Sequence, residues 1–484
     1  MGKISKNLFY NIIYQIIIVI VPLITSPYIA RVLGASQIGI YSYTYSISIY
    51  FCMFVVLGIG NYGNRSIAKS INIEERSKKF FSIYLIQFFM GIFVIILYIT
   101  YLYLFEKNFF QIGLIQTLLI LSYVFDITWF FYGIENFKII VFRNIFIKLL
   151  SLILILLLVK SEKDLWIYTL IMSGGTFLGQ LLSWPLLKSN IILLKIKISD
   201  LREHIKPIII LFLPVLSINI FSYMDKTMLG FLGSMEETGF YENADKIISI
   251  PKSLIAAAGS VMLPRTANMI SNGEYKKSQE YVETTMIFIF LVGSALLFGL
   301  LGVGEKFSVV FWGEEFHKSG FIIMILSPAF FMSAIGNVIR TQYLIPRNKD
   351  KEYTISLLIA AVINLIINFL AIPRLGAYGA AIGTVCSELE IVVVQCYLSK
   401  NEINMFKYIK NGFIYLIFGL VMFVPVYLFG INTDHNLVNL LIQISIGALV
   451  YLILIILYLI LSKKSYILEF KNKINRRFKH EKES

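Results

Sequence analysis

The chain has 484 residues, of which 57% are hydrophobic, 15% aromatic and only 15% charged, and its mean hydropathy is +0.76. This composition excludes an ordinary soluble globular protein and indicates an integral membrane protein. The formal net charge of +14 does not call for a nucleic-acid partner, because most basic residues fall in the loops between apolar segments. The three cysteines lie inside apolar segments, where we expect them to pack rather than to form disulfides or bind a metal.

Fourteen apolar segments follow one another along the chain, and most are long enough for the roughly 20 residues that a membrane-spanning helix needs. We place them near residues 8–30, 38–60, 80–104, 111–133, 142–159, 165–187, 206–231, 239–263, 282–302, 320–345, 354–373, 376–398, 408–430 and 437–461. The first segment continues past residue 30 without a cleavage site, so we interpret it as a retained span. The fold class predicted is therefore an all-α membrane protein with 14 spans.

The distribution of Lys and Arg predicts the orientation of these spans. Thirty-three of the 43 Lys and Arg residues fall in the N-terminus, every second connection and the tail, whereas seven fall on the opposite side. We therefore predict a multi-pass membrane protein with both termini in the cytoplasm. The heavy use of isoleucine, lysine and asparagine is typical of an AT-rich bacterial genome and favours the bacterial plasma membrane as its location. The basic tail, residues 462–484, is expected to be solvated or to lie against anionic lipid headgroups.

A short internal repeat relates the two halves of the chain. Residues 30–47, ARVLGASQIGIYSYTYSI, resemble residues 228–247, MLGFLGSMEETGFYENADKI. Each copy stands between the first and second spans of a seven-span half, which predicts two pseudo-symmetric lobes around a central cleft. The predicted organisation is an N-terminal lobe (1–187), a cytoplasmic linker (188–205), a C-terminal lobe (206–398), two further spans (399–461) and the tail.

Polar residues recur at helical spacing within three spans. In the eighth span they are Glu242, Asp245, Lys246, Ser249, Lys252 and Ser253; in the second Tyr41, Thr44, Tyr45, Ser48 and Cys52; in the first Asn11, Gln15, Thr25 and Ser26. Such stripes must face the protein interior or water. We expect them to line a water-filled cleft between the lobes, with hydrogen bonding between packed helices as the alternative for the hydroxyl groups.

The order of spans and two segments carry a family resemblance: residues 129–168, which begin WFFYGIENFKII, and residues 239–247, GFYENADKI. In these features the chain resembles the polysaccharide repeat-unit flippases of the multidrug/oligosaccharidyl-lipid/polysaccharide (MOP) exporter superfamily. The resemblance implies a bundle of two lobes that alternates between the two membrane faces. Its substrate would be an undecaprenyl-diphosphate-linked oligosaccharide carried from the inner to the outer leaflet, with membrane lipids, a polysaccharide polymerase and other assembly proteins as partners.

Ionisable residues at membrane depth are functional candidates, because each costs roughly 2.5 to 3.5 kcal/mol or more. A diphosphate substrate would suit lysine, a compact cation, so we interpret Lys246 first, and Lys252 second, as phosphate contacts. The alternative for Lys246 is a helical ion pair with Glu242, four residues earlier. Asp225 and Lys226 point about 100° apart on their helix, so we expect different neighbours for them, with Lys226 facing the cleft or paired locally.

A comparison with the lipid II branch of the same superfamily separates this chain from it. That branch has cavity arginines on the first, second and eighth spans; Lys246 matches the eighth-span position, but the other two have no counterpart. Arg31 is displaced toward the outer end of the first span, and the second span carries Tyr41 and Tyr45. We therefore expect a different head group, contacted by these residues and by Asp245.

The lipid II branch also has a sodium site, and its pattern implies one here. The corresponding residues are Asp225, Asn364, Asn368 and Thr384, whose carboxylate, amide and hydroxyl oxygens suit a hard cation. We predict that they bind a coupling ion, sodium or a proton, with hydrogen bonding between helices as the alternative for the two asparagines. Glu388 and Asp126 are further acidic candidates.

Three other functions compete with the flippase. The chain has no GxxxxGK[ST] phosphate loop, so we expect no ATP hydrolysis; we expect no catalytic residues and no cofactor beyond the coupling ion. A membrane polysaccharide polymerase would need a larger outer loop than residues 305–320. A multidrug antiporter of the same superfamily is the nearer alternative, although the intramembrane lysines would repel cationic drugs.

Four arginines near the ends of spans are interpreted as anchors that set the topology: Arg65, Arg143, Arg340 and Arg347.

Overall fold

The computed structural model describes residues 3–400 and 404–461, and these ranges are helical with no strand in them. The first half contains α1 (Lys3–Val56), α2 (Ile59–Ala68), α3 (Ile73–Phe105), α4 (Phe110–Val124), α5 (Thr128–Gly133), α6 (Phe137–Leu158) and α7 (Leu165–Leu181). The second half contains α8 (Ile198–Leu232), α9 (Met235–Ser271), α10 (Tyr275–Trp312), α11 (His317–Ile339), α12 (Asp350–Leu375), α13 (Ala377–Ser399), α14 (Met405–Ile431) and α15 (Leu437–Leu461).

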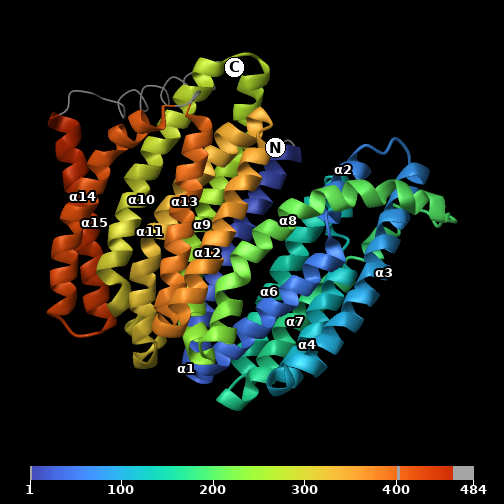
Figure 1. Cartoon of the computed structure of the whole chain (residues 1–484), viewed down its shortest axis with the longest axis horizontal. Coiled ribbons are helices and arrows are strands. Elements are labelled where there is room, and N and C mark those ends of the chain that lie inside the picture. The colour runs from blue at the N-terminus through green and yellow to red at the C-terminus, as the bar shows by residue number, and fades with distance from the viewer. Residues whose placement is uncertain (1–2, 401–403, 462–484) are drawn as a thin grey trace.

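Thirteen helical segments of the described chain are long and apolar enough to cross a membrane. The prediction was fourteen spans, and the difference lies at the first two, which form the single element α1. The backbone of Gly34 divides this element, with φ 72° and ψ 173°. The amide of Ala35, which follows it, donates a 2.8 Å hydrogen bond to Glu315 Oε1. In Figure 1 the chain turns back at the α1 label, so a left-handed glycine replaces an ordinary loop.

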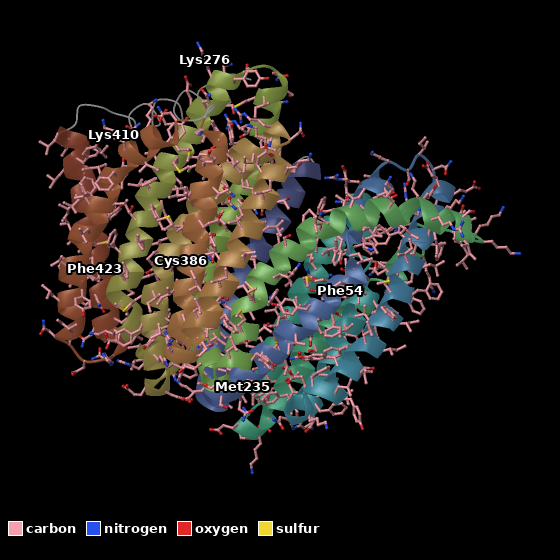
Figure 2. The ribbon with its side chains drawn as sticks, viewed as in Figure 1. Phe54, Met235, Lys276, Cys386, Lys410 and Phe423 are labelled. Carbon is pink, nitrogen blue, oxygen red and sulfur yellow. The ribbon has the colours of Figure 1, made fainter. Side chains whose placement is uncertain are left out.

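The helices form two groups (Figure 1). Helices α3, α4, α6 and α7 lie on one side and α9 to α15 on the other, while α8 crosses between them. The groups diverge toward the end of the molecule where α1 begins and approach each other at the opposite end, beside Met235 (Figure 2). Lys276 and Lys410, two of the residues assigned by the sequence to the side of the termini, lie at the end where α1 begins (Figure 2).

Small residues allow the close approach beside Met235. An added Cβ at Gly39 of α1 would lie 1.6 Å from the carbonyl oxygen of Met235, and one at Gly239 of α9 would lie 1.9 Å from that of Ala35. Glycine at both positions therefore lets the two backbones touch, as is common between membrane helices. The two glycines belong to the two copies of the internal repeat.

The segment boundaries follow the sequence prediction with local differences. α8 begins at Ile198, inside the predicted linker 188–205, and ends near the predicted end of the seventh span. Helix α9 contains Pro251 and Pro264 and runs further than the predicted eighth span. The residue before α9, Ser234, caps its N-terminus, because its side chain accepts a hydrogen bond from the backbone amide of Glu237. The predicted tail, residues 462–484, lies outside the described residues.

Candidate functional site

A cavity of about 470 Å³ lies among α8, α9, α11, α12 and α13. Its walls carry six charged side chains: Asp225, Lys226, Asp245, Lys252, Arg340 and Glu388. All the residues that line it lie between positions 218 and 395, so this cavity belongs to the second half of the chain. The sequence predicted a cleft between the two lobes, with the first and second spans also in its wall. This cavity is different, because neither of those spans lines it.

Asp225 on α8 is the centre of a buried hydrogen-bonded cluster. Its Oδ1 accepts a 2.6 Å hydrogen bond from Asn368 Nδ2 on α12, and its Oδ2 accepts hydrogen bonds of 2.6 Å from both Thr384 Oγ1 on α13 and Tyr241 OH on α9. Asn368 Nδ2 also donates to Asn364 Oδ1 at 3.0 Å. The structure therefore brings together the four residues that the sequence selected for a coupling ion, and adds Tyr241.

The chemistry of this cluster fits a hard cation. It offers carboxylate, amide and hydroxyl oxygens, and Asn368 Oδ1 is buried without a hydrogen-bond partner. Within the described residues the Asp225 carboxylate has no ion-pair partner, although Asp225 is only 8% exposed. Asp225, Asn364, Asn368 and Thr384 would hold the ion, which would neutralise the carboxylate. No group of three or more His, Cys, Asp or Glu side chains that could hold a metal occurs in the part of the chain described.

Lys226, the next residue, has different partners, and both of them lie on α9. Its Nζ lies 2.7 Å from Glu242 Oε2 and 2.9 Å from Asp245 Oδ2. Ser42 of α1 donates a 2.8 Å hydrogen bond to the same Glu242 oxygen, so this ion-pair network joins α8 and α9 to the second part of α1. As predicted, the side chains of Asp225 and Lys226 have different neighbours. Of the two alternatives for Lys226, facing the cleft or pairing locally, the structure shows local ion pairs.

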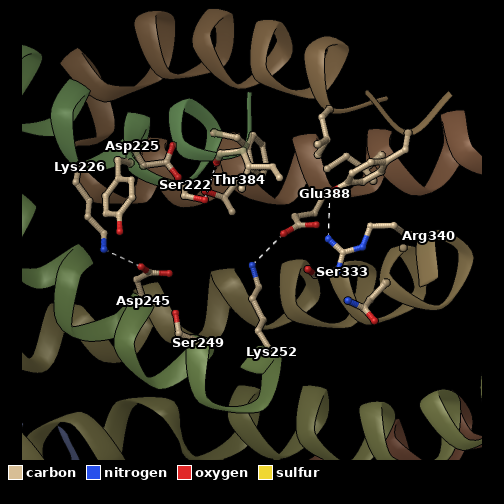
Figure 3. Close-up of a pocket in the computed structure, with 18 of the residues that line it drawn as sticks. Ser222, Asp225, Lys226, Asp245, Ser249, Lys252, Ser333, Arg340, Thr384 and Glu388 are labelled. Carbon is tan, nitrogen blue, oxygen red and sulfur yellow. Dashed lines mark hydrogen bonds and ion pairs between the residues drawn. The ribbon is translucent and has the colours of Figure 1, made fainter. Parts of the chain in front are cut away.

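The other two intramembrane lysines are also paired. Lys252 Nζ lies 2.9 Å from Glu388 Oε1 across the cavity, as Figure 3 shows. Lys246 Nζ lies 3.3 Å from Glu242 Oε1, four residues earlier on α9, and its side chain is 31% exposed. Lys246 is absent from the cavity wall. The structure thus contains the local ion pair that was the alternative to a phosphate contact at this position.

Three predicted substrate contacts lie elsewhere. Arg31 donates to the backbone carbonyls of Val310 and Phe311 at 3.0 and 3.2 Å. The rings of Tyr41 and Tyr45 stack at 5.7 Å, and Tyr45 also packs against Tyr223 at 6.2 Å. Tyr223 lines the cavity, but Arg31, Tyr41 and Tyr45 do not; their interactions here are with other protein groups.

The hydroxyl stripes of the first two spans mostly join helices. Ser48 donates a 2.6 Å hydrogen bond to Gln116 Oε1 of α4, and Gln116 Nε2 donates at 2.9 Å to Thr44. Ser26 accepts a 2.9 Å hydrogen bond from Trp312 Nε1. The side chains of Asn11 and Gln15 lie outside the described residues. For Ser48, Thr44 and Ser26 the structure therefore shows hydrogen bonding between packed helices, the alternative that the sequence left open for the hydroxyl groups.

Among the cavity residues that sequence reasoning missed are Arg340 and Tyr353. Arg340 was interpreted as an anchor because it stands near the predicted cytoplasmic end of a span. It begins a π-helical turn, Arg340–Leu344, that continues α11, and this turn places its guanidinium on the cavity wall with Tyr353. The spacing in the sequence could have identified Arg340 as a cavity residue. It lies seven residues after Ser333 and three after Asn337, and both of these also line the cavity.

A bundle of apolar membrane helices around a cavity lined by charges defines a multi-pass membrane transporter. The model of the family described as "Polysaccharide biosynthesis protein" matches residues 4–270. This is more than half of the chain, so the chain belongs to this polysaccharide biosynthesis family.

Several known proteins are similar to this chain in sequence or in fold. The chain is 22% identical over 409 residues to the "Putative O-antigen transporter" of Escherichia coli (strain K12), covering 83% of this chain and 97% of the relative. It is 26% identical over 242 residues to the "Probable low-salt glycan biosynthesis flippase Agl15" of Haloferax volcanii, covering 49% of this chain and 50% of the relative. The fold is similar to that of the lipid II flippase MurJ in an inward closed conformation, with a TM-score of 0.73, 17% identity and coverage of 94% and 99% of the two chains. A multidrug resistance transporter of the MATE family, inward-facing, gives a TM-score of 0.55 at 13% identity, with coverage of 80% and 99%.

Proposed function

We propose that this protein moves undecaprenyl-diphosphate-linked oligosaccharide repeat units from the inner to the outer leaflet of the bacterial plasma membrane, for capsule or exopolysaccharide assembly. The observation that carries the proposal is the charge-lined cavity inside the membrane helices of a chain from the polysaccharide family. A polar cavity at membrane depth lets a hydrophilic head group leave water while the lipid tail stays in hydrocarbon. The product would pass to a polysaccharide polymerase.

The mechanism proposed is alternating access coupled to a cation. With the termini in the cytoplasm, the groups of helices diverge toward the cytoplasm and pack together at the outer end, beside Gly39 and Gly239. Binding of sodium or a proton at Asp225 would change the charge of the cluster that joins α8, α9, α12 and α13. Because the Lys226 network links two of these helices, α8 and α9, to α1 through Ser42, the state of the ion site can bias the contact between the two groups.

The test is flipping of a fluorescent undecaprenyl-diphosphate oligosaccharide in proteoliposomes, with and without a sodium or a proton gradient. Flipping that depends on the protein supports the proposal, and stimulation by one gradient identifies the coupling ion. Absence of flipping together with efflux of a cationic dye would assign the chain to the drug-antiporter branch instead. Empty liposomes and a protein-containing sample without a gradient are the controls.

A further inference from the structure

Among the residues that the structure describes, the cavity wall carries one cationic side chain that no carboxylate neutralises. Of its three cationic side chains, Lys226 pairs with Asp245 at 2.9 Å and Lys252 pairs with Glu388 at 2.9 Å. These pairs leave Asp225 and Arg340, and neither has an ion-pair partner within residues 3–400 and 404–461. In the view of Figure 3, Asp225 and Arg340 lie at opposite ends with the Lys252–Glu388 pair between them.

The environment of Arg340 holds the guanidinium in place without neutralising it. Its Nη1 donates a 3.0 Å hydrogen bond to the hydroxyl of Tyr353, and its guanidinium carbon lies 5.5 Å from the centre of the same ring. Its Nε is buried and has no hydrogen-bond partner. A guanidinium has five N–H donors, so donors remain for a ligand. The π-helical turn that begins at Arg340 is a feature often found at functional sites.

Further donors lie on the same helical face. Ser333 and Asn337 precede Arg340 by seven and three residues, a spacing that aligns side chains on α11, and both line the cavity. Figure 3 shows Ser333 beside Arg340. A hydroxyl, a side-chain amide and a planar guanidinium together can bind an oxyanion through several oxygens, and arginine is suited to the two-pronged recognition of phosphate or carboxylate.

We infer that Arg340, with Tyr353, Ser333 and Asn337, forms an oxyanion-binding subsite of the transport cavity. This inference rests on the proposed function and adds to it that the substrate presents an anionic group to the α11 side of the cavity. Two parts of a lipid-linked glycan share this chemistry, the diphosphate and the carboxylate of an acidic sugar. The subsite is separate from the cluster around Asp225, which offers only oxygens to a cation.

A second arginine provides a matched control. Arg265 Nη1 donates a 3.0 Å hydrogen bond to Tyr281 OH, and its guanidinium carbon lies 4.6 Å from that ring centre. This arrangement repeats the arginine–tyrosine geometry of Arg340 and Tyr353, but Arg265 is exposed and absent from the cavity wall. If binding weakens when Arg340 is substituted but not when Arg265 is substituted, the loss is therefore due to the cavity site and not to the loss of an arginine–tyrosine contact.

The experiment measures binding to the full-length protein in detergent. The probes are undecaprenyl diphosphate, undecaprenol, and a neutral or glucuronate-containing oligosaccharide; the variants are Arg340→Gln, Arg340→Lys, Tyr353→Phe and Arg265→Gln. We expect Arg340→Gln to weaken binding of an anionic probe by at least about tenfold, which corresponds to about 1.4 kcal/mol. Arg340→Lys and Tyr353→Phe should give smaller losses, whereas Arg265→Gln and all binding of undecaprenol should match the wild type.

The outcomes separate the two sources of the anion and the two proposals. A loss with undecaprenyl diphosphate assigns the subsite to the diphosphate, and a loss confined to the glucuronate probe assigns it to an acidic sugar. Wild-type affinity of folded Arg340→Gln for every anionic probe would overturn the inference, even if the protein flips its substrate. If Arg340→Gln does not fold, unchanged binding by both Arg340→Lys and Tyr353→Phe would overturn it. Failure of the wild type to bind or flip any probe would overturn the proposed function as well.

Discussion

Asp225 and Lys226 are neighbours in sequence, but their side chains bind different partners. Asp225 accepts hydrogen bonds from Asn368, Thr384 and Tyr241, whereas Lys226 pairs with Glu242 and Asp245. The two opposite charges therefore do not neutralise each other directly. One belongs to a cluster of oxygen ligands and the other to an ion-pair network, and substitutions should affect them differently.

Asp225→Asn should abolish the response to the coupling ion. If sodium binds the oxygens around Asp225, it stabilises the folded wild type by about 2.7 kcal/mol at 100 times its Kd, and the variant loses this gain because the negative charge is removed. The measurement is thermal unfolding in detergent with sodium or choline chloride, followed by flipping with a sodium gradient. Asp126→Asn is the control, because Asp126 lies outside the cavity wall and accepts a hydrogen bond from the Thr128 amide. An equal sodium response in Asp225→Asn and the wild type would contradict the site.

Lys226→Met should destabilise the protein strongly. The side chains of Lys226 and Glu242 are each 12% exposed, and removing one partner of a buried ion pair costs about 3 kcal/mol or more because the other charge stays buried. Adding Asp245→Asn should recover part of the loss, because Asp245 has no other ion pair in the described chain, while Glu242 keeps Lys246 and Ser42. Thermal unfolding of the two variants tests this. The exposed pair of Lys277 and Glu274 supplies the control Lys277→Met, and a similar small change in both lysine variants would count against the network.

The sequence predicted the membrane class, the helical fold and four residues that the structure brings together in the hydrogen-bonded cluster around Asp225. Apolar length and composition are local properties, so the spans could be placed from sequence alone. The cluster was found because the resemblance placed Asp225, Asn364, Asn368 and Thr384 on three helices that pack together. Whether an ion occupies it depends on free energies that no spacing encodes.

Helical spacing could not tell which polar residues face a cavity. Periodicity gives the face of a helix that is polar, but not the neighbour that this face meets. Ser48 and Thr44 therefore fit a water-filled cleft and a contact with Gln116 equally well until packing is known. Arg340 was missed for a related reason: charges near span ends usually set topology, and only the tertiary structure shows that its turn faces inward.

Gly39→Ala should disrupt the contact between α1 and α9. Its Cβ would lie 1.6 Å from the carbonyl oxygen of Met235, so the two backbones would have to separate. We expect flipping to fall at least about tenfold, because the packed outer end is needed for alternating access, together with a lower unfolding temperature. Gly299→Ala is a matched control inside α10, since an added Cβ there meets nothing within 4 Å. Unchanged flipping and stability in Gly39→Ala would show that this contact is dispensable.

Lys246→Ala distinguishes a substrate contact from a structural ion pair. Its side chain is 31% exposed and its partner Glu242 also binds Lys226, so losing this i,i+4 pair should cost only about 0.5 kcal/mol or less. Lys252→Ala should cost more, because Glu388, whose side chain is 7% exposed, would be left without its ion-pair partner. Binding of undecaprenyl diphosphate and thermal unfolding are measured on both variants. A stable Lys246→Ala protein with weaker binding supports the predicted phosphate contact; wild-type binding assigns Lys246 to the ion pair with Glu242, because its charge is then not needed for the substrate.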